Sequence, residues 1–247
     1  MKEEYLKMAK RACFIAGEQL VGNYEKTRKA ESEIGRDIKV KGDKYSESVI
    51  IDYLQKHSPF PMLSEEKGRI GDVSSDGYMW IVDPLDGSLN FSRGIPFNCI
   101  SIALWQNNRP VLGVINDFNR QEMFSGIADE GAWLNDKRIK PSVVDICDQA
   151  VLCTGFPVGT DFSTQGIKEF VEDIKRYKKI RLLGSAALSL AYVAAGRSDV
   201  YYERDIMLWD VAAGIAIVSG AGGKTDFKRT KREKSFHVYA SNGLISR

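Results

Sequence analysis

Two aspartates three residues apart, Asp83 and Asp86, stand in the densest group of chemically capable residues in this sequence, WIVDPLDGSLNF at 80–91. The apolar residues before them predict a buried strand over 78–82. Paired carboxylates where a buried strand ends are typical of sites in α/β proteins. The simpler alternative is a solvated acidic turn beside a helix cap.

The three residues that shape this turn indicate which ligand it would take. Pro84 fixes one backbone dihedral, and Gly87 allows an unusual one. Gly87 and Ser88 are expected to open a helix, whose first N–H groups favour an anion. Carboxylates beside a bound anion would repel it, and a divalent cation between them resolves the conflict.

Composition narrows the kinds of chemistry that are available. The 247 residues include 35 Lys and Arg against 33 Asp and Glu, a formal charge of +2, which argues against a dedicated nucleic-acid binder. Apolar residues make up 43%, as in a globular protein. The only histidines are His57 and His237, so histidine-rich zinc catalysis is nearly excluded. Any metal is expected to be held by carboxylates.

The cysteines and the apolar stretches indicate the cellular compartment in which the protein is expected. None of the four cysteines forms a CxxC pair, and the first twenty residues do not resemble a signal peptide. The longest stretch of small apolar residues, 211–223, is interrupted by glycines and is too short to span a bilayer. We expect a reduced, cytoplasmic protein with no membrane partner.

Periodicity predicts the elements that must position the acids. Polar segments at 25–44 and 67–77 predict a mobile loop or ribbon and a second loop, and a soft seam is expected near 141–149. Helices are predicted over 4–30, 46–56, 163–176, 185–195 and 209–220. Strands are predicted over 60–63, 78–82, 99–105, 111–116, 122–127, 150–154, 179–183, 199–203 and 236–241. The second half thus reads as alternating strands and helices.

Two separated motifs, in the order DPxDG[ST]xNF and WDxAAG, make the chain resemble the inositol monophosphatase family. The resemblance covers nearly the whole chain, and its segments are SEE (64–66), WIVDPLDGSLNF (80–91), GIPF (94–97), the run at 113–136, the run at 184–203 and WDVAAGIAIVSGAGG (209–223). It implies a layered αβαβα sandwich of the α+β class, as in inositol monophosphatase and fructose-1,6-bisphosphatase. Residues 1–247 would form a single domain.

The resemblance also implies Mg²⁺-dependent hydrolysis of phosphate monoesters with two or three ions. The implied metal ligands are Glu65, Asp83, the carbonyl of Leu85, Asp86 and Asp210. The implied catalytic residues are Asp43 and Ser88, which would orient the attacking water, and Glu65. The implied substrate-binding residues are Asp86, Gly87, Ser88, Gly184, Ser185, Ala186, Glu203 and Asp210. Hard oxygen ligands suit Mg²⁺.

Each of these acids has a simpler interpretation when taken alone. Glu65 could be a loop acid, Asp43 a solvated acid in a charged segment, and Glu203 a surface acid at a strand end. Asp210 could cap the helix that follows it. Ser185 and Ala186 could be an ordinary cap and a small packing residue. Only their joint occurrence favours the functional interpretation.

The substrate class follows from finer details of the same resemblance. SLNF at 88–91 followed by GIPF is similar to inositol and fructose enzymes, and Glu203 matches an acid that accepts sugar hydroxyls. Inositol 1-phosphate is therefore the expected substrate, with fructose 1,6-bisphosphate, 3′-phosphoadenosine 5′-phosphate and histidinol phosphate as alternatives. Arg204 and Asp205 depart from the family pattern and bear on selectivity. A homodimer is expected. The alternative from another class is a non-catalytic regulatory partner protein.

Overall fold

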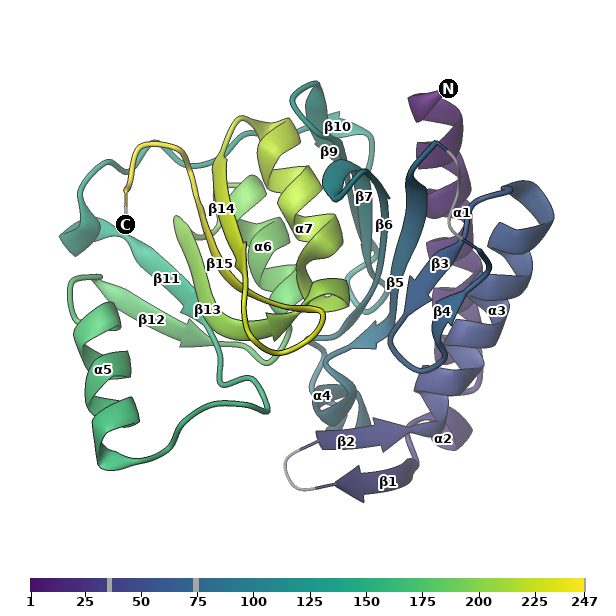
Figure 1. Ribbon diagram of the computed structural model, residues 1–247, viewed down its shortest axis with the longest axis horizontal. Coiled ribbons are helices and arrows are strands. Elements are labelled where there is room, and N and C mark those ends of the chain that lie inside the picture. The colour runs from purple at the N-terminus through teal and green to yellow at the C-terminus, as the bar shows by residue number, and fades with distance from the viewer. Residues whose placement is uncertain (35–36, 73–75, 247) are drawn as a thin grey trace.

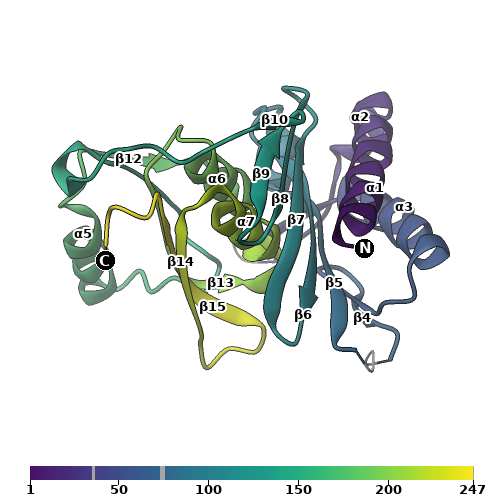
Figure 2. The same cartoon turned by 90° about the horizontal axis from the view of Figure 1, so that it is seen from above.

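The computed structural model describes residues 1–34, 37–72 and 76–246. Helices and sheets alternate in five layers, helix–sheet–helix–sheet–helix, from one side of the molecule to the other (Figure 1 and Figure 2). The layered αβαβα expectation is confirmed. That residues 1–247 form a single domain stays a prediction. The central apolar cluster contains side chains from both halves of the chain.

The larger sheet has eight strands in the order β10-β9-β8-β7-β6-β5-β3-β4. All neighbouring pairs are antiparallel except β3 and β5, which are parallel. The strands are β3 (Met62–Ser64), β4 (Gly68–Ile70), β5 (Tyr78–Asp86), β6 (Cys99–Gln106), β7 (Arg109–Asp117), β8 (Glu122–Ile127), β9 (Gly131–Leu134) and β10 (Lys137–Arg138).

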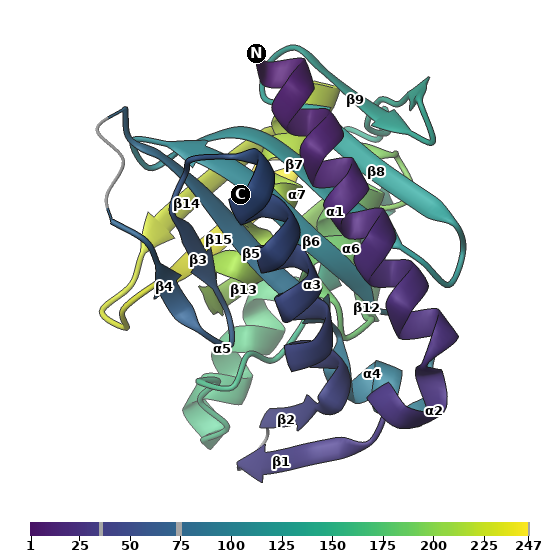
Figure 3. The same cartoon turned by 90° about the vertical axis from the view of Figure 1, so that its right-hand side faces the viewer.

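Two amphipathic helices, α1 (Lys2–Gly22) and α3 (Lys41–His57), cover the outer face of this sheet (Figure 3). Helix α1 buries residues that recur every three or four positions, which is the stripe that a surface helix packs against a core. These residues are Leu6, Ala9, Cys13, Ala16 and Leu20.

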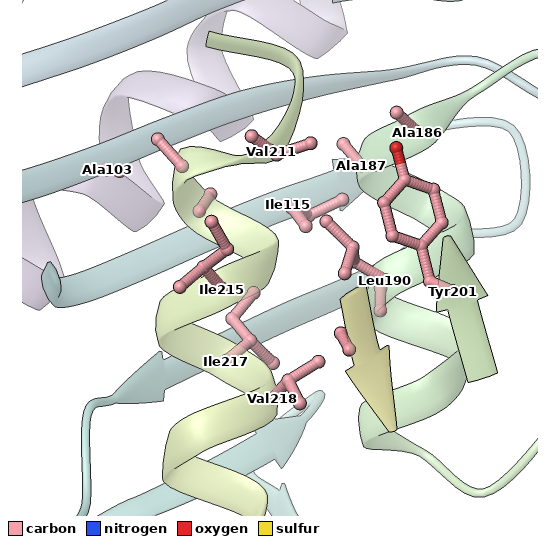
Figure 4. Packing of buried hydrophobic residues seen from close by; sticks show 14 of the residues in the cluster. Ala103, Ile115, Ala186, Ala187, Leu190, Tyr201, Val211, Ile215, Ile217 and Val218 are labelled. Carbon is pink, nitrogen blue, oxygen red and sulfur yellow. The ribbon is translucent and has the colours of Figure 1, made fainter. Parts of the chain in front are cut away.

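The second sheet has five strands in the order β12-β11-β13-β15-β14. Helices α6 and α7 lie between the two sheets and are apolar on nearly every face, and Figure 4 shows their side chains interlocking. Helix α5 lies on the far side (Figure 1). The bounds are β11 (Val151–Thr154), α5 (Thr164–Ile174), β12 (Lys179–Leu182), α6 (Ala186–Ala194), β13 (Val200–Met207), α7 (Leu208–Ala221), β14 (Lys224–Arg229) and β15 (Ser235–Ser241).

Several predicted bounds were wrong for physical reasons. The ribbon expected within the polar segment 25–44 is present as an antiparallel hairpin, but the segment also holds the first turn of α3, because the buried carboxylate of Asp43 accepts the N–H of Val40 and starts the helix early. Strand β4 lies inside the predicted loop 67–77. Alternation fails at the end of the chain, where β14 and β15 form an antiparallel hairpin. The shorter elements are α2 (Tyr24–Thr27), β1 (Ala30–Ile34), β2 (Asp37–Val40), α4 (Ser88–Arg93) and the 3₁₀ turn η1 (Cys147–Gln149).

The close packing of α7 on β7 generates a stability prediction. A Cβ at Gly113 would lie 2.3 Å from the carbonyl oxygen of Ala213, so Gly113→Ala forces the helix away from the sheet. We expect a loss of about 1–3 kcal/mol in the free energy of unfolding, measured by chemical denaturation. Gly22→Ala is the control, because a Cβ there meets nothing within 4 Å. Equal stability of Gly113→Ala and the wild type would contradict this packing.

Candidate active site

Six acids from four separate segments line one cleft of about 420 Å³, namely Glu65, Asp83, Asp86, Glu203, Asp205 and Asp210. Asp83 and Asp86 lie at the end of β5, which runs through both residues instead of stopping at position 82. Glu65 directly follows β3, Glu203 lies on β13, and Asp210 is in the first turn of α7. The parallel pairing of β3 with β5 brings Glu65 beside the two aspartates, since the N–H of Glu65 donates to Val82 O at 3.2 Å.

Three aspartates of the cleft, Asp83, Asp86 and Asp210, have pKa values above the ordinary value. Burial raises the pKa of Asp83 and of Asp210 well above the ordinary value, and the charges of Glu65 and Asp86 raise both pKa values further. Burial also raises the pKa of Asp86 to about 6, although the hydrogen bonds that its carboxylate accepts lower that pKa. Ionising all of these carboxyl groups together is therefore unfavourable unless a cation binds among them.

Asp86 is held by the start of α6. Its Oδ2 accepts from Ser185 Oγ at 2.5 Å and from the N–H of Ala187 at 2.8 Å. Ser185 is also the cap of α6, because its Oγ accepts the N–H of Leu188 at 3.2 Å. Gly184 and Ala186, on either side of Ser185, line the cleft as well. Ser185 thus caps helix α6 and also lines the cleft, so its two interpretations are compatible.

Asp43 and Ser88 form a hydrogen-bonded pair at the edge of the cleft. Ser88 Oγ lies 2.6 Å from Asp43 Oδ1 and 2.9 Å from the carbonyl oxygen of Leu85. Burial raises the pKa of Asp43 to about 7, although the hydrogen bonds from Ser88 and from the N–H of Val40 oppose that rise. Asp43 is only 2% exposed, so the solvated-acid interpretation is wrong. Ser88 lines the cleft and connects Asp43 to it.

Glu203 is buried as well, which overturns its interpretation as a surface acid. Burial and then the charge of Asp86 raise the pKa of Glu203 to about 8. The absence of a side chain at Gly155 makes room for this carboxylate, because a Cβ there would lie 2.7 Å from Glu203 Oε1.

Sequence reasoning assigned no role to Asn90, which joins the two halves of the site. Its Nδ2 donates to Phe97 O at 2.8 Å and to Leu183 O at 2.9 Å. Gly87 beside it has φ 88°, and a Cβ there would lie 2.9 Å from Phe97 O. The position of Asn90 inside the 80–91 motif was the available signal, but its partners lie far away in sequence.

The donor set of the cleft fits a hard divalent cation. Within residues 1–34, 37–72 and 76–246, no three acidic, histidine or cysteine side chains form a ready-made group that could hold a metal ion. The carboxylates instead surround a common space and raise one another's pKa, which a bound cation would reverse. Oxygen donors are those that Mg²⁺ and Ca²⁺ take. The individual ligand roles stay predictions.

None of the helices in the described part of the chain combines the length and apolar character needed to cross a membrane.

Comparison with known proteins identifies the family. The model of the inositol monophosphatase family matches residues 1–246. An inositol-1-monophosphatase from Synechocystis is 35% identical over 90% of this chain and 78% of its own length, and Nus factor SuhB from Escherichia coli K12 is 37% identical over 88% and 83%. The structure of an inositol monophosphatase from Anabaena superposes with a TM-score of 0.85, at 34% identity over 98% of this chain and 92% of that one. The chain belongs to the inositol monophosphatase family.

Proposed function

We propose that this protein is a magnesium-dependent phosphomonoesterase for small sugar or polyol phosphates, with inositol 1-phosphate as its best substrate. The observation that carries the proposal is the convergence of buried, mutually repelling carboxylates on one cleft. A binding module without chemistry has no need for charges that cost stability when they are ionised. The similarity to an inositol-1-monophosphatase supports the substrate class.

The first role that we assign to residues of the cleft is to hold the metal ions. Glu65, Asp83, the Leu85 carbonyl, Asp86 and Asp210 would hold two or three Mg²⁺ ions, which when bound would neutralise phosphate charge and acidify water.

The Asp43–Ser88 pair would orient the attacking water. The Ser88 hydroxyl donates to Asp43, so its lone pairs remain available to accept from that water. The N–H groups of Gly87 and Ser88 at the start of α4 would bind phosphate oxygens.

Glu203 would bind the hydroxyl groups of the sugar, together with groups at the start of α6. A carboxylate can accept from two neighbouring hydroxyls, which suits a polyol. The charge of Asp86 contributes to the raised pKa of Glu203, so a cation at Asp86 would favour the ionised, accepting form. Gly184, Ser185 and Ala186 line the same cleft as Glu203 and would complete the pocket.

A second candidate function is a regulatory role with partner proteins, because several relatives are named Nus factor SuhB. Phosphate release by the purified protein with Mg²⁺ and with excess EDTA separates the two candidates. The same assay with the fructose, adenosine and histidinol phosphates ranks the substrates, and sedimentation tests the homodimer. Release from none of the esters in Mg²⁺ would refute the enzymatic proposal.

Removing one charge from the cleft should abolish catalysis. Asp86→Asn keeps the size of the side chain and an oxygen that can accept from Ser185, but it weakens cation binding. We expect kcat to fall at least about a thousandfold on every substrate. Asp136→Asn, which changes an exposed acid outside the cleft, should leave kcat unchanged. Retention of activity in Asp86→Asn with a normal fold would rule out this mechanism.

A substitution at Glu203 should weaken recognition of the sugar hydroxyl groups without affecting the hydrolysis step. Glu203→Gln keeps the shape but accepts hydroxyl hydrogen bonds less well, so kcat/KM for inositol 1-phosphate should fall about tenfold to a hundredfold. Hydrolysis of p-nitrophenyl phosphate, which offers no hydroxyl group, should change little. Equal losses on both substrates would show that Glu203 has a structural or catalytic role instead.

Stability should depend on pH and Mg²⁺ together. The pKa of Asp86 is about 6 in the folded protein against about 3.9 in an unfolded chain, so the folded state binds this proton more tightly. Stability from this group is complete below pH 4 and is lost as pH rises through 6. The Tm increase caused by Mg²⁺ in thermal scans should therefore be larger at pH 8 than at pH 5. An equal increase at both pH values would contradict the linkage.

A further inference from the structure

Tyr201 and Glu203 lie on the same face of strand β13. The pairing of β13 with β15 is regular from Val200 to Glu203, and the register shifts only afterwards, at a bulge in which Asp205 has a φ of 60°. Residues two apart in a regular strand point to the same side of the sheet. Tyr201 belongs to the apolar cluster between the two sheets, together with residues of α6 and α7. The face that carries both residues is thus the one turned toward these helices.

The hydroxyl of Tyr201 is a buried polar group without a partner. The side chain is fully buried, and in the part of the chain that the structure describes no group meets its Oη with hydrogen-bond geometry. In Figure 4 the hydroxyl points toward the start of α6, where Ala186 and Ala187 lie. Buried hydroxyls are rarely left unbonded, because the loss of water around them is costly. Tyr239 shows the ordinary arrangement, since its hydroxyl donates to the carbonyl oxygen of Ile245 at 3.2 Å.

Acids of the cleft lie near the Tyr201 hydroxyl. Burial raises the pKa of Tyr201 well above its ordinary value, and the charges of Glu203 and then of Asp210 raise it further. The hydroxyl in turn lowers the pKa of Glu203, which burial and the charge of Asp86 raise. A hydroxyl has this effect on a carboxyl group when it can donate to the ionised form. Of the pair, Glu203 lines the cleft and Tyr201 does not, so the hydroxyl approaches this carboxylate from the protein interior.

We propose that Tyr201 is a positioning residue, which donates a hydrogen bond to one carboxylate oxygen of Glu203 and so leaves the other oxygen free for the hydroxyl groups of the sugar. The inference rests on the proposed function and deepens it, because it names the residue that orients the sugar-binding acid. The parallel pairing of β11 with β13 brings Gly155 beside Glu203, where a Cβ would lie 2.7 Å from Oε1 and 3.2 Å from Oε2. A carboxylate with such free space on one side needs a fixed donor to present the same oxygen to every substrate.

Removing the Tyr201 hydroxyl alone tests this assignment. Tyr201→Phe keeps the buried ring and deletes only the donor. The control is Tyr239→Phe, which deletes a bonded hydroxyl from a tyrosine outside the cleft. Dissociation constants for inositol 1-phosphate and for p-nitrophenyl phosphate are measured by calorimetry with Ca²⁺, which takes oxygen ligands as Mg²⁺ does. The Tm of each protein without ligand is measured in thermal scans.

Tyr201→Phe should weaken the binding of inositol 1-phosphate about threefold to tenfold, because Glu203 loses the donor that holds it. The affinity for p-nitrophenyl phosphate should stay within about twofold. The Tm without ligand should be unchanged or higher, since removal of this hydroxyl leaves no partner unbonded. Tyr239→Phe should show the reverse pattern, with a lower Tm and unchanged affinity for both esters.

A second comparison uses Glu203→Ala, which removes the group that Tyr201 would position. In this background Tyr201→Phe should change the dissociation constant for inositol 1-phosphate by less than about twofold. Equal effects of Tyr201→Phe with and without Glu203 would overturn the assignment. Unchanged affinity in Tyr201→Phe, or no binding of inositol 1-phosphate by the wild type, would overturn it as well. Failure of the proposed function would look different, as no Mg²⁺-dependent phosphate release while this pattern of binding holds.

Discussion

Mutual repulsion among buried carboxylates is the constraint on which this structure depends. Asp83, Asp86 and Asp210 are withdrawn from water beside one another, and burial and the neighbouring charges oppose their ionisation. Such a group is tolerated when protons or cations balance it. Within the described residues, Lys39 and Arg232 are the basic side chains that line the cleft, and we propose that a divalent ion balances the remaining charge of the acids.

The layered fold is what brings these acids together. Asp83 and Asp86 come from the larger sheet, Glu203 from the smaller sheet, and Asp210 from the helix layer between them. The helices α6 and α7 are apolar on nearly all sides because both sheets cover them. Asp86 joins the end of β5 to the start of α6 through Ser185, so the candidate site and the core packing share the same contacts.

Much of this organisation could be predicted from the sequence, because strong patterns carry it. The apolar run before Asp83 and the motifs at 80–91 and 209–223 locate strand β5 and the start of α7, although β5 runs on to Asp86. Asp43 could not be placed from its own segment, since a polar stretch looks the same whether its acid is solvated or buried against Ser88.

Other features depend on pairing between distant segments and leave little local trace. Strand β14 was missed because an edge strand is half exposed and its sequence, KTDFKR, is mostly polar. The bulge at Asp205 arises only when β13 pairs with β15, and the bridging contacts of Asn90 arise only when the fold brings Phe97 and Leu183 within its reach. No periodicity in the sequence reports such contacts.

Anomalous diffraction from crystals soaked in Mn²⁺, which takes the same oxygen ligands as Mg²⁺, tests the central claim most directly. The account predicts at least two anomalous peaks in the cleft, near the carboxylate groups of Asp83, Asp86 and Asp210 that would hold the ions. Saturating Mn²⁺ with no ordered ion between these three aspartates would contradict it.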